Sequence, residues 1–184
     1  PMLGAVIAGA EFRAGQLGLS MVAVPNRARF MAGKVIATVL YTLGLWLVFV
    51  VAGYVIVYFT VKDWRPEILW ESALLLSCAQ LLLFMVTTML IGFGITLLTR
   101  STLVGIIFSV VSIMLVFAQV VAMVSPTLDA ILVPFSAARN LLLQGEDSGP
   151  PTTAGALHGA LVLTGWALLS VGSAAVAITR KDAR

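Results

Sequence analysis

Charged residues are scarce in this sequence. Of its 184 residues only 10% are Asp, Glu, Lys or Arg, whereas soluble globular domains carry about 25%. Hydrophobic residues make up 60% of the chain, and its mean hydropathy is +1.07. Because so few charges cannot cover a water-facing surface, this composition excludes a soluble globular domain and predicts an integral membrane protein.

Cysteine and histidine are nearly absent, with one residue of each. A single cysteine excludes an intramolecular disulfide and a cysteine metal site. Because Cys78 lies inside an apolar run, we predict that it is a small packing residue. His158 stands alone, whereas a bis-histidine haem or an H-E-x-x-H zinc site needs two histidines. The sequence has no G-x-x-x-x-G-K-[ST] stretch, so we expect no ATP hydrolysis by this chain. With one histidine, one cysteine and none of these motifs, we also predict no catalytic and no metal-binding residue.

Long apolar runs make up most of the chain. A membrane-crossing helix needs about 20 apolar residues for a hydrocarbon core about 30 Å thick. Residues 1–13 contain a shorter run, which predicts the end of a further helix whose earlier part precedes Pro1. We therefore predict an all-α integral membrane protein, with one transmembrane domain over 1–184 and five to six helices. The complete crossings are predicted at 34–61, 72–98, 103–124 and 154–178.

The segments between these runs carry charges and prolines. Residues 62–71, KDWRPEILWE, mix charges with tryptophan, as is typical of a membrane–water interface. Residues 99–102 predict a short turn. Residues 126–153 begin apolar and are broken at Pro134, which predicts a re-entrant segment that dips into the membrane and then a surface loop. Residues 179–184 form a tail after the last crossing.

The basic residues are distributed unequally between the two sets of flanking segments. Lys and Arg are enriched on the cytoplasmic side of membrane proteins. We therefore predict that the segment 11–34, the turn at Arg100 and the C-terminus are cytoplasmic. The cytoplasmic set is Arg13, Arg27, Arg29, Lys34, Arg100, Arg180, Lys181 and Arg184. The opposite set holds Lys62, Arg65 and Arg139, with six of the eight acids: Asp63, Glu67, Glu71, Asp129, Glu146 and Asp147.

The segment 11–34 is the longest stretch that is neither continuously apolar nor an obvious loop. Its charges stand at the two ends, and a run of modest polarity ends at Pro25 and Asn26. This pattern predicts a short amphipathic helix over 14–26 that lies at the membrane surface or projects into the cytoplasm. A soluble partner that held such a helix would be able to move the membrane helices on either side.

The order of residues in this segment resembles the permeases of the ABC-2 type of ATP-binding-cassette exporters. In that family a membrane helix ends at a Glu, an E-x-x-x-G-T stretch follows, a P-x-R turn comes later, and a Lys begins the next helix. Gln16 stands where the family usually has Thr. The matching residues here are Glu11, Gly15, Leu17, Val24-Pro25-Asn26-Arg27 and Gly33-Lys34.

Two further features extend the resemblance over essentially the whole chain. Residues 180–183, Arg-Lys-Asp-Ala, are similar to the R-R-D ending common in these permeases. Residues 128–143 match the proline-broken extracellular re-entrant region. Because such permeases usually have six helices, the resemblance implies that the first helix and part of the second are missing before Pro1.

The resemblance implies a type V exporter-like bundle whose coupling helix, residues 14–26, seats in a groove of a separate ATPase subunit. Two ATPase copies and a second permease, identical or paralogous, would complete the exporter, with ATP and Mg on the ATPases and no nucleic acid bound. The cargo would be a hydrophobic or amphipathic drug, lipid, peptide or glycan, moved out across a bacterial plasma membrane. The implied coupling residues are Glu11, Arg13, Gly15, Gln16, Leu17, Pro25, Asn26, Arg27, Arg29 and Lys34.

Alternatives stay open for several of these residues. Arg27 and Arg29 either pair with acids of the ATPase or lipid headgroups, or only anchor the topology. Glu11 either pairs with Arg13 or Lys34 or caps the following helix. The whole chain is alternatively a membrane scaffold, or an immunity or sensor subunit, that uses the same fold without transport.

Polar residues inside the predicted crossings form a second group of candidates. A polar side chain deep in a membrane helix faces protein or a water-filled cavity. It therefore lines a substrate path or joins helices to one another. Gly155 and Gly159 form a G-x-x-x-G pattern that is typical of close helix packing, although chance produces it easily in a chain with 16 glycines. The polar candidates are Gln80, Thr87, Thr88 and Gln119.

Overall fold

The computed structural model describes residues 1–10, 12, 27–62, 66–143 and 154–180. All secondary structure within these ranges is helical, which confirms the all-α prediction. The elements are α1 (Met2–Gly9), α3 (Arg27–Val61), the 3-10 helix η2 (Pro66–Trp70), α4 (Ser72–Thr99), α5 (Thr102–Ala118), α6 (Val120–Val124), α7 (Pro126–Leu132), α8 (Pro134–Leu142) and α9 (Ala156–Arg180).

Three of these helices are long and apolar enough to cross a membrane. They cover residues 29–61 of α3, 72–99 of α4 and 156–178 of α9. This finding supports the prediction of a membrane protein. Helix α5 is shorter, because its 17 residues give a length of about 25 Å.

The predicted crossing at 103–124 is not one continuous helix. The helix α5 ends at Ala118, and Gln119 adopts the left-handed conformation with φ 51°. A short helix, α6, then covers Val120–Val124. Nothing in the apolar run predicts this break, because left-handed residues are usually glycine or asparagine.

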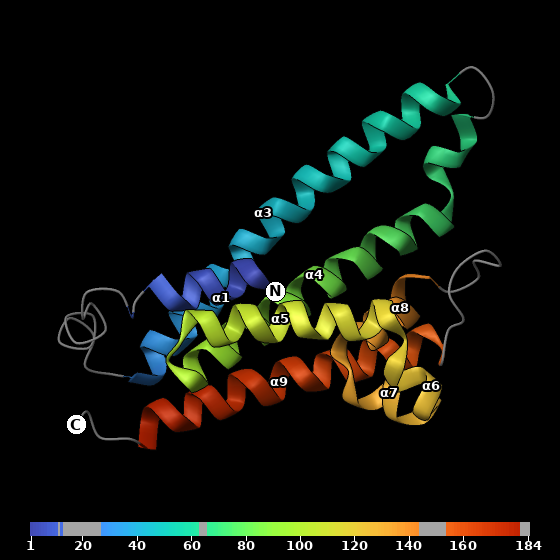
Figure 1. Cartoon of the computed structure of the whole chain (residues 1–184). Helices are drawn as coiled ribbons and strands as arrows, with labels where there is room; N and C mark the ends of the chain where they lie inside the picture. Colours follow the sequence, from blue (N-terminus) through green and yellow to red (C-terminus); the bar gives the residue numbers. More distant parts are fainter. Residues whose placement is uncertain (11, 13–26, 63–65, 144–153, 181–184) are drawn as a thin grey trace.

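The central element of the bundle is α4 (Figure 1). Its most extensive contacts are with α9 and α1, and it also packs on α3, α5 and α8. Phe93 of α4 is fully buried among Ala8 of α1 and Ala174 and Ile178 of α9. A second buried cluster joins Ile91 of α4 to residues of α8 and α9. The core therefore lies along the C-terminal half of α4, where its buried residues run from Thr87 to Leu97.

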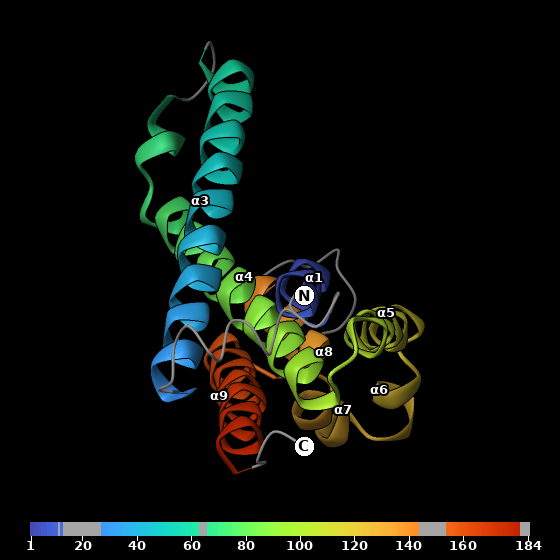
Figure 2. The same ribbon diagram turned by 90° about the vertical axis from the view of Figure 1, so that its left-hand side faces the viewer.

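The outer parts of α3 and α4 form a hairpin that projects away from the other helices (Figures 1 and 2). The two helices are joined within the hairpin where Trp46 Nε1 donates a hydrogen bond to the Cys78 carbonyl oxygen at 3.0 Å. Apolar side chains such as Val48 and Ile56 are exposed on it. In an aqueous protein so much exposed apolar surface is unusual, but a lipid bilayer is its natural solvent.

Glycines allow the closest helix contacts. A Cβ atom on Gly94 of α4 would overlap the backbone of Ser170 in α9, and a Cβ on Gly159 of α9 would overlap the Ala137 carbonyl oxygen in α8. Small residues commonly permit such approach between membrane helices. Of the G-x-x-x-G pair, Gly159 is buried against α8, whereas Gly155 is exposed.

Basic residues lie at or beside the ends of α3, α4, α5 and α9 at one end of the bundle, and the C-terminal end of α1, which has no basic residue in its last turn, lies there too. The C-terminal end of α1, the N-terminal end of α3, the turn between α4 and α5, and the C-terminal end of α9 all lie there, at the left of Figure 1. The turn is as short as predicted, since α4 ends at Thr99 and α5 begins at Thr102. The η2 helix and the α6–α8 region lie toward the opposite ends of the helices.

Candidate functional site

The predicted coupling helix 14–26 lies outside the described residues. The same holds for seven of the proposed coupling residues, namely Glu11, Arg13, Gly15, Gln16, Leu17, Pro25 and Asn26. Helix α3 begins at Arg27, before the apolar run that predicted it, and Arg29 is exposed in its first turn. Lys34 is half-buried, with Nζ 5.3 Å from the centroid of the Phe30 ring, in a cation–π contact.

The predicted polar residues of α4 lie at two depths. Gln80 is half-buried, whereas Thr87 and Thr88 are buried in the bundle. The Thr87 hydroxyl donates to the Leu83 carbonyl oxygen at 2.7 Å, and the Thr88 hydroxyl donates to the Phe84 carbonyl oxygen at 2.6 Å. Both hydroxyl protons are therefore engaged by the backbone of their own helix.

The segment after α6 folds into two short helices because of its serine and prolines. The Ser125 hydroxyl accepts a hydrogen bond from the Leu128 N–H and caps α7, whose first residue is Pro126. Val133 is extended, as expected before proline, and Pro134 begins α8. The predicted break at Pro134 is thereby confirmed. The Trp166 indole of α9 donates to the Ile131 carbonyl oxygen at 3.1 Å and ties the pair to the bundle.

A buried ion pair joins the two short helices. Arg139 Nη2 lies 2.9 Å from Asp129 Oδ2, and the two residues are only 7% and 1% exposed. The Ser136 hydroxyl donates to Asp129 Oδ1 at 2.7 Å. Asp129 stands in the first turn of α7 and Arg139 in the last turn of α8, so each charge is also favoured by its own helix dipole. The cluster therefore links α7 to α8.

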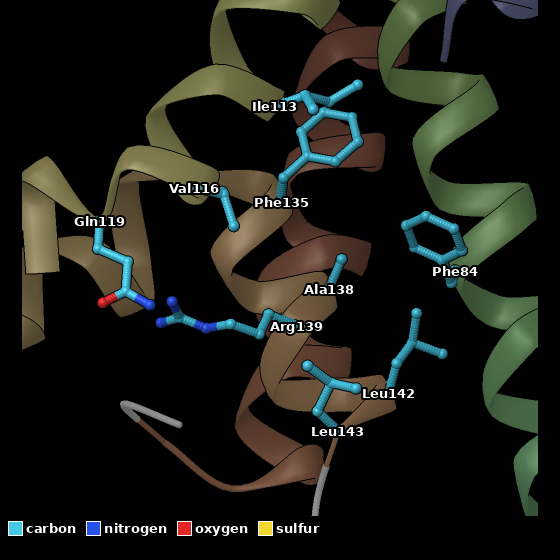
Figure 3. A pocket seen from close by; sticks show the side chains of 9 residues that line it. All are labelled: Phe84, Ile113, Val116, Gln119, Phe135, Ala138, Arg139, Leu142 and Leu143. Atoms are coloured by element: carbon cyan, nitrogen blue, oxygen red, sulfur yellow. The ribbon is translucent and has the colours of Figure 1, made fainter. Parts of the chain in front are cut away.

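Beside this ion pair lies a cavity of about 320 Å³ between α4, α5 and α8 (Figure 3). Its wall is mostly apolar, and its polar groups are the side chains of Arg139 and Gln119. Figure 3 shows the Arg139 guanidinium and the Gln119 carboxamide pointing toward one another. The apolar lining residues are Phe84, Ile113, Val116, Phe135, Ala138, Leu142 and Leu143.

Of the sequence-predicted candidates that lie in the described part of the chain, only Gln119 lines this cavity. Sequence reasoning assigned Asp129 and Arg139 to the flank opposite the cytoplasm and missed their role as a buried pair. The available signal was an acid and a base ten residues apart on the two sides of Pro134, in an otherwise apolar segment. Within the described ranges no group of three or more His, Cys, Asp or Glu side chains could hold a metal ion.

Comparison with known proteins gives no relative: no protein-family model, curated protein or solved structure matches this chain.

Proposed function

We propose that this chain is the permease subunit of an ATP-binding-cassette exporter of the ABC-2 type. In this proposal it moves a hydrophobic or amphipathic molecule outward across a bacterial plasma membrane. The energy comes from two copies of a separate ATPase, which carry ATP and Mg, and a second permease completes the membrane part. The order of residues between Glu11 and Lys34 led to this proposal.

The observation that carries the proposal is the gathering of basic helix ends at one end of the bundle. Arg29 and Lys34 near the start of α3, Arg100 between α4 and α5, and Arg180 at the end of α9 all belong to that end (Figure 1). The positive-inside rule makes this the cytoplasmic end. The C-terminal end of α1 and the N-terminal end of α3, which flank segment 14–26 in the sequence, lie at this end, where a cytoplasmic ATPase would act.

The length of α3 supports the proposed coupling. This helix has 35 residues and continues from the basic end into the projecting hairpin. An α-helix of that length spans about 50 Å and transmits a displacement of one end as a rigid body. A partner that moved the residues before Arg27 would therefore tilt α3 against α4.

Affinity purification of the full chain in mild detergent tests the proposal. We expect an ATPase with a G-x-x-x-x-G-K-[ST] motif to co-purify with the intact chain, and an Arg27→Glu, Arg29→Glu variant to lose it. Lys62→Glu is the matched charge reversal, because Lys62 is exposed just beyond the opposite end of α3.

The other outcomes distinguish a coupling role of Arg27 and Arg29 from a role as topology anchors. Recovery of the ATPase with the Arg27→Glu, Arg29→Glu variant as well as with Lys62→Glu would leave the exporter proposal in place. It would reduce Arg27 and Arg29 to topology anchors. Recovery of no ATPase with well-folded intact protein would contradict the exporter and favour a membrane scaffold that does not transport.

A further inference from the structure

We propose that the pocket between the end of α3 and η2 binds the headgroup of a zwitterionic phospholipid whose cation is a quaternary ammonium. The pocket has a volume of about 320 Å³. The lipid is a resident of this surface and not a transported molecule, so the inference goes beyond the proposed export function and does not depend on an ATPase. The lining residues are Tyr54, Val55, Tyr58 and Phe59 of α3 and Leu69 and Trp70 of η2.

The pocket is open to the surroundings of the protein. Tyr58 is 50% exposed and Trp70 is 86% exposed, so a ligand can reach both side chains. Tyr54 lies deeper and is half-buried. The site stands at the end of the projecting hairpin, away from the helices of the central bundle (Figures 1 and 2). A molecule that enters it therefore comes from the membrane beside the hairpin and not through the bundle.

Aromatic side chains form most of the wall, which points to a cation as the ligand. The face of an aromatic ring attracts a cation that lies within about 6 Å of the ring centroid, and quaternary ammonium groups are recognised in this way. Phe59 already makes such a contact, since Lys62 Nζ lies 5.7 Å from its ring centroid. The rings of Tyr54, Tyr58 and Trp70 would hold the ammonium group of the ligand.

The charges near the pocket match the two charges of a zwitterionic headgroup. Glu67 in η2 and Glu71 directly after Trp70 are both exposed, and both favour an ammonium group. Lys62 is exposed one helical turn beyond Phe59, where it can pair with the phosphate. A purely anionic headgroup would meet the two carboxylates without a cation of its own. A purely cationic one would leave the lysine without an anion.

The face of α3 that leads to the pocket provides room for an acyl chain. Val48, Val51 and Val55 recur at spacings of three and four residues, and Tyr58 continues the series, so the four side chains lie on one face of the helix. They are 48–65% exposed. A phospholipid can place an acyl chain along this face and its headgroup in the pocket, whereas a small quaternary ammonium compound would leave the face uncovered.

Lipid binding to the full chain in an uncharged detergent tests the site. Titrations followed by native mass spectrometry give the dissociation constants of dioleoyl phosphatidylcholine and of an isostere in which 3,3-dimethylbutanol replaces choline. The isostere has the same shape and the same phosphate but no cation. We expect the choline lipid to bind about twofold to thirtyfold more tightly, the range that a cation–π contact provides.

Variants of exposed side chains locate this preference. Tyr58→Leu with Trp70→Leu removes two ring faces but keeps apolar side chains, so it should abolish the preference for choline. Tyr41→Leu is the matched control, because Tyr41 is an exposed aromatic residue about 25 Å from Tyr58 along α3, and it should keep the preference. Lys62→Gln should weaken both lipids alike, since both carry the phosphate.

A second pair of substitutions tests the site with its rings intact. Glu67→Gln with Glu71→Gln should lower the preference for choline. Equal binding of the two lipids by the unchanged chain, or a preference that survives the loss of Tyr58 and Trp70, would overturn the proposal. Neither result would bear on the exporter, because no ATPase takes part in the measurement.

Competition tests the phospholipid as the occupant. Glycerophosphocholine has the same headgroup without acyl chains, so it lacks the apolar part that would cover the valine face of α3. We expect it to displace the choline lipid only at more than about a hundredfold higher concentration. Displacement at equal concentration would contradict a phospholipid as the ligand.

Discussion

Replacing Arg139 by methionine is expected to lower the free energy of unfolding by about 3–5 kcal/mol, the largest effect we predict for a single side chain. The change removes the guanidinium that lies 2.9 Å from Asp129 and leaves a buried carboxylate with less compensation. It also removes one link between α7 and α8, whereas the hydrogen bond from Ser136 to Asp129 remains. Equilibrium unfolding in detergent by circular dichroism measures the loss.

A double variant separates the lost pair from lost packing. Arg139→Met with Asp129→Leu removes both charges and keeps apolar volume, so it should recover most of the stability lost by Arg139→Met alone. Leu142→Met, at the neighbouring turn of α8, is the control for a small change of shape and should cost less than about 1.5 kcal/mol. A loss below about 1 kcal/mol for Arg139→Met would show that water reaches the pair.

Leucine at Gly94 is expected to separate α4 from α9 and to destabilise the protein by about 1–3 kcal/mol or more. A Cβ at this position overlaps the backbone carbonyl group of Ser170, and backbone atoms within a helix have little freedom to move aside. Because α4 and α9 share the most extensive helix contact, the effect should spread through the core around Phe93.

Gly44→Leu provides the matched control for this glycine. Gly44 lies in α3, and a Cβ there meets nothing within 4 Å. Leucine at Gly44 should therefore leave the unfolding midpoint unchanged or raise it, since leucine has a higher helix propensity than glycine. Equal midpoints for Gly94→Leu and Gly44→Leu would contradict the close packing of α4 on α9.

Hydropathy predicted the long helices well because each apolar run is long enough to be unambiguous. The predicted crossing 72–98 and the helix Ser72–Thr99 differ by one residue. The helix α3 begins at Arg27, seven residues before the predicted crossing, because hydropathy marks the apolar part of a helix and not its extension through a polar interface.

The candidate site was much less predictable. The break at Gln119 lies inside an apolar run with no glycine or proline near it, so only tertiary packing determines it. The pairing of Asp129 with Arg139 requires the turn at Val133 and Pro134 to bring two helices together. The sequence indicated that turn, but not that both charges face inward.

The orientation of the bundle decides whether a cytoplasmic ATPase can reach segment 14–26, so labelling from the two sides of the membrane tests the account most directly. In a Cys78→Ala background, Glu67→Cys places one thiol at an exposed position near the N-terminal end of α4. Arg100→Cys places one thiol at an exposed position at its C-terminal end. A membrane-impermeant maleimide is then added to intact cells. We predict that Glu67→Cys reacts at once and that Arg100→Cys reacts only after the cells are permeabilised. Reaction of Arg100→Cys in intact cells would place the basic end outside and contradict the exporter.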